Sequence, residues 1–282
     1  MATKGEEKMN QRVKPKLGGA VYLLPNVLTT GNLFFGFFSI VKSLQGDLQY
    51  ASSAILLAAI FDVLDGRVAR LTNSSSEFGV QYDSLCDMVS FGLAPAFLMY
   101  QGGLNTLGRI GWIVCFVFLA CGALRLARFN VQSSIGKASG DFTGLPIPMA
   151  AGVVACFMAM SIDMSKQSFP VDWMNVLASW LADELVRVLF LCIAGAILAL
   201  CMVSNITFRS HKTLIIKGVK PFRLLVLLVV LVALVAFQPE LFGFLFFFLY
   251  AISGPIEWIF GWKRAISDEE IFEETYDEDQ HV

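Results

Sequence analysis

Four aspartates stand close together in a stretch of the chain that is otherwise rich in apolar residues. Asp62, Asp65, Asp83 and Asp87 all fall within residues 61–92, FDVLDGRVARLTNSSSEFGVQYDSLCDMVSFG. Helical residues three or four positions apart lie on one face, so each pair presents two carboxylates on the same side of its helix. The short turn TNSSSE between the pairs predicts that the two helices are antiparallel neighbours, which would bring all four carboxylates together.

A cluster of carboxylates has a recognisable chemistry. Four negative charges in one pocket repel one another unless a cation compensates them. Carboxylate oxygens suit a hard divalent cation, so the cluster predicts a site for Mg²⁺ or Mn²⁺, with enough ligands for two ions. Two ions that bridge a diphosphate would stabilise the charge that develops during phosphoryl transfer. Asp87 could also accept the proton of an attacking hydroxyl, a role that needs one carboxylate free or weakly bound.

The residues around the aspartates favour a phosphorylated ligand. Gly66 and Gly79 leave space beside the carboxylates, so that a ligand can approach the backbone. Arg70 lies about two helical turns after the first aspartate and offers a fork of donors that suits phosphate. The turn adds three hydroxyl groups, those of Ser74, Ser75 and Ser76.

The overall composition is that of a membrane protein. The 282 residues are 56% hydrophobic and 16% charged, whereas soluble domains average about 45–50% and about 25%. The formal net charge is −2, and nothing in the sequence predicts a nucleic-acid partner. None of the six cysteines forms a CxxC pair, and His211 and His281 are far apart, which excludes a histidine-based triad and a zinc site of the usual spacing.

Apolar runs alternate with polar breaks along almost the whole chain. This pattern predicts an all-α integral membrane protein with about eight transmembrane helices. We expect helices near residues 24–43, 49–71, 79–101, 109–129, 145–163, 185–205, 221–237 and 240–260. The expected parts are a cytosolic N-terminal arm over 1–22, a transmembrane catalytic domain over 23–262 and an acidic cytosolic tail over 263–282.

The distribution of basic residues predicts the orientation in the membrane. Eight spans place both termini on one face, and that face receives 17 of the Lys and Arg residues against 4 on the other. Basic residues in short loops concentrate on the cytosolic side. We therefore expect cytosolic termini and a polar active-site cavity that opens to the cytosol from the cytoplasmic membrane. The basic segment 209–223 is most simply a contact with anionic membrane lipids.

The aspartate segment resembles the signature of the CDP-alcohol phosphatidyltransferase family. The match covers eight positions at fixed gaps: Asp62, Asp65, Gly66, Ala69, Arg70, Gly79, Asp83 and Asp87. Members of this family join a CDP-linked lipid to an alcohol and release CMP, with a divalent metal. The resemblance implies that all four aspartates bind metal and that Asp87 is also the general base. It implies binding of the CDP-lipid by Gly66, Ala69, Arg70, Ser76 and Gly79.

Further segments narrow the resemblance to the membrane-embedded phosphatidylserine synthases, which use L-serine. These segments are LPNVLTTGNLFFG on the first helix, RLARFNV at 125–131, FTGLPIPMAAG at 142–152, VSNITFRSHK at 203–212 and SGP at 253–255. The resemblance implies that CDP-diacylglycerol and L-serine are the substrates, that the protein is a homodimer, and that Asn26 and Thr29 help to hold the nucleotide. It places the acceptor pocket near residues 125–148, which include Arg125, Arg128 and Asn130. Two arginines one turn apart could clamp the serine carboxylate, or could instead reach lipid phosphates.

Other functions compete with this interpretation. Within the family, the acceptor could be glycerol 3-phosphate, inositol phosphate or choline. A membrane prenyltransferase also presents aspartates to a metal-bound diphosphate, but its chemistry does not call for the Gly66 and Ala69-Arg70 positions. A cation transporter could use the carboxylates as an ion path, although the sequence shows no internal repeat of the kind that many transporters contain.

Overall fold

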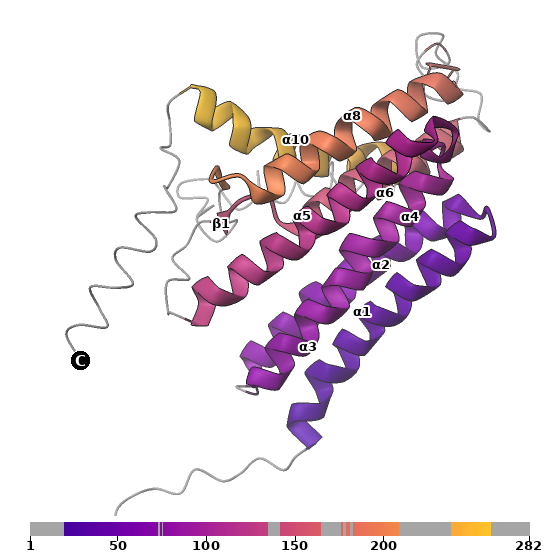
Figure 1. Cartoon of the computed structure of the whole chain (residues 1–282). Coiled ribbons are helices and arrows are strands. Elements are labelled where there is room, and N and C mark those ends of the chain that lie inside the picture. The colour runs from indigo at the N-terminus through magenta and orange to yellow at the C-terminus, as the bar shows by residue number, and fades with distance from the viewer. Residues whose placement is uncertain are drawn as a thin grey trace, which may run out of the picture.

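The computed structural model describes residues 20–72, 74, 76–134, 142–164, 176, 179–180, 183–208 and 238–260. Most of the helices run side by side as a bundle, and the last one is inclined to the rest (Figure 1). The α-helices are α1 (Ala20–Leu44), α2 (Leu48–Leu71), α3 (Glu77–Asp87), α4 (Ala94–Gln101), α5 (Arg109–Ser134), α6 (Ile147–Met164), α8 (Glu184–Val203) and α10 (Pro239–Ile259). A π-helix, η1 (Met88–Leu93), joins α3 to α4, and a 3-10 helix, η2 (Leu104–Leu107), follows α4.

The helical prediction is confirmed over the described residues. Seven of the eight expected ranges coincide with helical segments to within a few residues, and the eighth, 221–237, lies outside the described residues. Five described helices, α1, α5, α6, α8 and α10, are long and apolar enough to cross a membrane. The expected arm over 1–22 is described only at residues 20–22, which already belong to α1. The basic segment 209–223 and the tail 263–282 lie outside the described residues, so the total of eight spans stays a prediction.

The third expected helix, 79–101, consists of three consecutive helical segments, α3, η1 and α4, which together we call the column. Pro95, near the start of α4, has no N–H, so the regular α-helical ladder cannot pass through this point unchanged. The chain shifts to the wider π pattern, in which the N–H of Ala94 bonds to the carbonyl of Val89. Because η1 begins directly after Asp87, the change of helix type adjoins the aspartates, as π segments often adjoin functional sites.

Helix α6 forms the centre of the packed core. Most of its side chains are buried, and it packs against α2, α4, α8 and α10. Small residues such as Ala150, Ala151 and Gly152 let these neighbours approach closely, as is common between helices in membranes. The interior therefore consists of close helix contacts around α6.

A pair of short strands that the sequence did not predict closes one end of the bundle. β1 (Phe142–Thr143) pairs antiparallel with β2 (Thr207–Phe208). Gly144 follows β1 with a φ of 78°, a conformation that glycine adopts without steric cost. Phe208 is fully buried and packs against Gly254 and Tyr250 of α10. The strands thus link the start of α6, the end of α8 and α10.

Helix α1 packs directly against the column that carries Asp83 and Asp87. A Cβ atom at Gly36 would lie 2.6 Å from Cα of Ser90, so a glycine is required for α1 and η1 to approach this closely. On its other side, α1 meets α2, where Gly31 faces the ring of Phe61. Helix α1 therefore contacts both aspartate-bearing helices.

We predict that Gly36→Ala destabilises the protein, because the added methyl group must displace the backbone of η1. The expected cost is about 1–3 kcal/mol, measured as a lower Tm in detergent. Gly92→Ala in η1 is the matched control, since its added Cβ would meet the flexible side-chain ends of Leu119 and Met88. Equal Tm values for the two variants would contradict a requirement for glycine at position 36.

Candidate active site

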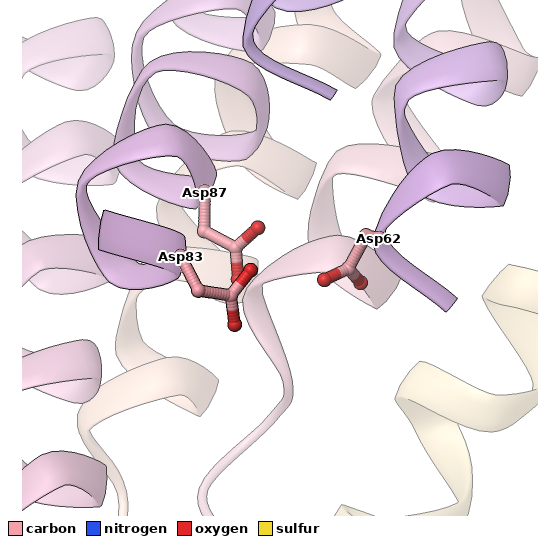
Figure 2. Close-up of side chains that lie close together, drawn as sticks. All are labelled: Asp62, Asp83 and Asp87. Carbon is pink, nitrogen blue, oxygen red and sulfur yellow. The ribbon is translucent and has the colours of Figure 1, made fainter. Parts of the chain in front are cut away.

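Three aspartate side chains converge between two helices. Asp62 extends from α2, and Asp83 and Asp87 extend from α3 toward it (Figure 2). One carboxylate oxygen from each of the three lies within 4.8 Å of the others. This confirms that the two helices bring distant carboxylates together, as their spacing and the short turn predicted. Oxygens this close are suitably placed to share one metal ion.

Asp65 lies beside this cluster but is not part of the three-residue group. Its side chain is 4% exposed and interacts electrostatically with Asp83 and Asp62. It also lies near Thr29 of α1, whose Oγ1 donates a hydrogen bond of 3.0 Å to the carbonyl of Pro25. The fourth aspartate therefore stands next to the other three, close to α1.

The unpaired oxygens of the cluster suit a divalent cation. Oδ2 of Asp65 and Oδ1 of Asp83 are buried and have no hydrogen-bond partner among the described residues. Buried anionic oxygens without a partner are costly, and a cation would compensate them. All four side chains offer hard oxygen ligands, which are the ligands that Mg²⁺ and Mn²⁺ prefer. The donor set thus fits the metal that the sequence predicted.

A residue that the sequence analysis did not assign also belongs to the site. Asn32 of α1 is fully buried, and its Nδ2 donates a hydrogen bond of 2.9 Å to Oδ1 of Asp87. Ser90 donates from Oγ to the backbone carbonyl of Asn32 at 3.0 Å. Because Asn32 follows Thr29 by three residues, helical spacing alone could have indicated that the two share a face.

The residues proposed to bind the nucleotide fall into two groups. Ser76 caps α3, where its Oγ accepts a hydrogen bond of 3.0 Å from the N–H of Gly79. A Cβ atom at Gly79 would lie 3.6 Å from Oδ1 of Asn26, so Asn26, Ser76 and Gly79 lie together. The second group is on α2, where Gly66 faces open space, Ala69 is half-buried and Arg70 is exposed.

The three residues proposed for the acceptor have different surroundings. Arg125 is 8% exposed and interacts electrostatically with Asp87 and Asp62. Arg128 instead donates to the carbonyl of Val203 at 3.4 Å and to Oδ1 of Asn205 at 2.6 Å, at the end of α8. Of the two arginines, Arg125 is the one whose charge acts on the aspartates, although it forms no ion pair with them within 4.0 Å.

Asn130 lies on a different surface from Arg125. Its Nδ2 donates to Oγ of Ser84 at 2.9 Å. Both side chains line a groove of about 270 Å³ between α3 and α5. Asn130 is therefore tied to α3 beside this groove.

Sequence comparisons agree with the geometry of the site. The model of the CDP-alcohol phosphatidyltransferase family matches residues 22–181. The chain is 34% identical over 240 residues to a CDP-diacylglycerol–serine O-phosphatidyltransferase of Helicobacter pylori, covering 85% of this chain and 92% of that protein. It is 44% identical over 136 residues to an archaetidylserine synthase of Methanothermobacter thermautotrophicus, covering 48% of this chain and 57% of that protein. It is 43% identical over 145 residues to a CDP-diacylglycerol–serine O-phosphatidyltransferase of Saccharomyces cerevisiae, covering 46% and 51%. The chain therefore belongs to the CDP-alcohol phosphatidyltransferase family.

Proposed function

We propose that this membrane protein transfers the phosphatidyl group of CDP-diacylglycerol to L-serine, giving phosphatidylserine and CMP. The observation that carries the proposal is the convergence of Asp62, Asp83 and Asp87 in a member of this family. The names of the relatives from Helicobacter pylori and Saccharomyces cerevisiae support serine as the acceptor. Membership of the family favours phosphatidyl transfer over prenyl transfer or cation transport.

In the proposed reaction, Asp87 accepts the proton of the serine hydroxyl as the hydroxyl oxygen attacks the phosphorus atom attached to diacylglycerol. The bond from this phosphorus to the oxygen of the CMP phosphate then breaks, and CMP leaves with the bonding electrons. Burial of Asp87 at 8% exposure supports this role, because it limits the access of water that could replace serine.

Asp62, Asp65, Asp83 and Asp87 would hold the divalent cation, and the number of carboxylates supports two ions of Mg²⁺ or Mn²⁺. When bound, the metal would neutralise the diphosphate and stabilise the negative charge that develops on the departing CMP. Asp87 would contribute to this site and also receive the proton, as the family resemblance implies.

The nucleotide would be held from two sides of the aspartate cluster. Asn26, Ser76 and Gly79 lie together at the start of α3, and Thr29 lies near Asp65. On α2, Gly66 and Ala69 present little side-chain bulk, and Arg70 offers guanidinium donors to phosphate. The open space beside Gly66 supports close approach of the CDP moiety to the backbone.

Arg125 is our candidate for binding the serine carboxylate. It is buried within electrostatic reach of Asp87 and Asp62, and a buried guanidinium forms strong hydrogen bonds to a carboxylate. Arg128 would instead support the site from a distance, by bonding to the carbonyl of Val203 near the end of α8. Asn130 would act through its contact with Ser84 on α3.

The membrane arrangement is part of the proposal. The bias of basic residues supports both termini and the active site on the cytosolic face of the cytoplasmic membrane, with eight spans in total. The family resemblance supports a homodimer.

The acceptor is tested with purified protein, CDP-diacylglycerol, Mn²⁺ and one labelled alcohol at a time: L-serine, glycerol 3-phosphate, inositol phosphate or choline. We expect labelled phosphatidylserine, and CMP in equal amount, from L-serine. Each transfer releases one CMP, so equal amounts of CMP and labelled lipid show that the label comes from the transfer reaction and not from a contaminating lipid. A labelled lipid from one of the other alcohols, and none from L-serine, would overturn serine as the acceptor.

We predict that Asp87→Asn lowers kcat by at least about 100-fold while the protein stays folded, because the amide can accept no proton. Asp47→Asn is the matched control, since Asp47 forms an exposed ion pair of 2.9 Å with Lys42 outside the cluster. Its kcat should equal that of the wild type. The measurement is CMP release together with Tm, and an active Asp87→Asn enzyme would remove Asp87 from the role of base.

We predict different effects from the two arginines of α5. Arg125→Met should raise the KM for L-serine about tenfold or more, because a charge-assisted hydrogen bond to the carboxylate is lost, and should change the KM for CDP-diacylglycerol less. Arg128→Met should mainly lower Tm, because its contacts to Val203 and Asn205 are lost. The opposite pattern, with the serine KM sensitive to Arg128 alone, would assign the carboxylate contact to Arg128.

A further inference from the structure

The contact between Asn32 and Asp87 joins two helices in the interior of the protein. Asn32 belongs to α1 and Asp87 to the end of α3, 55 positions later in the chain. Both side chains are buried, with exposures of 0% and 8%. A hydrogen bond to a carboxylate is stronger than one between neutral groups, and burial increases its strength. The contact therefore constrains the position of the Asp87 carboxylate.

The backbone near Asn32 is held in the same place by a second contact. Ser90 lies one helical turn after Asp87 and donates from Oγ to the backbone carbonyl of Asn32 at 3.0 Å. Gly36 allows this approach, because a Cβ atom there would collide with Ser90. Asn32 is thus bonded to the aspartate-bearing column through both its main chain and its side chain.

The amide group of Asn32 has a defined orientation. A carboxylate only accepts hydrogen bonds, so the NH₂ end of the amide must face Asp87 and the oxygen must face elsewhere. Oδ1 of Asn32 is buried and has no hydrogen-bond partner among the described residues. Leaving a buried carbonyl unpaired costs free energy, which an apolar residue of similar size would avoid. The contact with Asp87 offers a reason for an asparagine at this position.

We infer that Asn32 is a positioning residue for the transfer reaction: its amide holds Oδ1 of Asp87, so that Oδ2 is the oxygen that serves the cation and the serine hydroxyl. The two oxygens of Asp87 then differ in function, because an oxygen that accepts an amide N–H is fixed and less available as a ligand. This inference rests on the proposed function in assigning the reaction, but the effect on metal binding does not depend on the acceptor.

The inference is tested with Asn32→Leu, which keeps a similar shape and removes the donor. A residue that orients a metal ligand typically contributes about 10–100-fold to metal affinity or activity. We expect kcat to fall about 10–100-fold, with the KM for CDP-diacylglycerol changed by less than about threefold. We also expect Mn²⁺ to bind about tenfold more weakly to the protein without substrates, measured from the electron paramagnetic resonance of free Mn²⁺.

Ser39→Ala is the matched control. Ser39 lies about two turns after Asn32 on α1, is fully buried and has no hydrogen-bond partner among the described residues. Its removal should leave both kcat and Mn²⁺ affinity unchanged. If the leucine variant does not fold, as judged by Tm and gel filtration, kcat and Mn²⁺ affinity are measured on Asn32→Ala instead.

The outcomes separate the inference from the proposed function. Weaker Mn²⁺ binding by the Asn32 variant, with no phosphatidylserine formed even by the wild type, would support positioning of Asp87 and overturn serine transfer. Wild-type Mn²⁺ affinity and a kcat within about threefold of the control, in a folded Asn32 variant, would overturn the positioning role whatever the acceptor.

Discussion

The mutual repulsion of four buried or half-buried carboxylates is the constraint on which the rest of the site depends. Asp62, Asp83 and Asp87 point at one another between α2 and α3, and Asp65 lies beside them. Such an arrangement persists only where the surrounding structure holds the side chains in place or supplies compensating charge. Arg125 supplies positive charge from α5 and Asn32 supplies a donor from α1. The carboxylate oxygens without a hydrogen-bond partner among the described residues, Oδ2 of Asp65 and Oδ1 of Asp83, suit a divalent cation.

Close packing of helices makes this arrangement possible. Gly36 allows α1 to meet the column at Ser90, which places Asn32 against Asp87. The π-helix η1 begins after Asp87 and changes the helical pattern as the chain approaches Pro95. The packing of α1 against η1 therefore also determines the position of the Asp87 side chain.

The two arginines of α5 have different surroundings although they are only three positions apart. Arg125 is buried and interacts electrostatically with Asp87 and Asp62, whereas Arg128 forms hydrogen bonds near the end of α8. Three positions correspond to about 60° around a helix, and this rotation is enough for the side chains to meet different neighbours. The polar contacts of Arg128 also stabilise the region where α8 leads into β2. One turn of α5 thus carries an arginine that acts on the aspartates and an arginine that stabilises the contact with the end of α8.

Periodicity and composition were sufficient to predict the described helices, their approximate ends and the convergence of the aspartates. These features depend on local spacing, because residues three or four apart share a helix face and a short turn makes neighbouring helices antiparallel. The contact of Asn32 with Asp87, the different surroundings of Arg125 and Arg128, the π-helix and the strand pair were not predicted. Each of these depends on how helices distant in sequence are rotated and spaced against one another. Only the tertiary structure decides this, because packing of side chains between helices sets those rotations and local sequence patterns do not specify them.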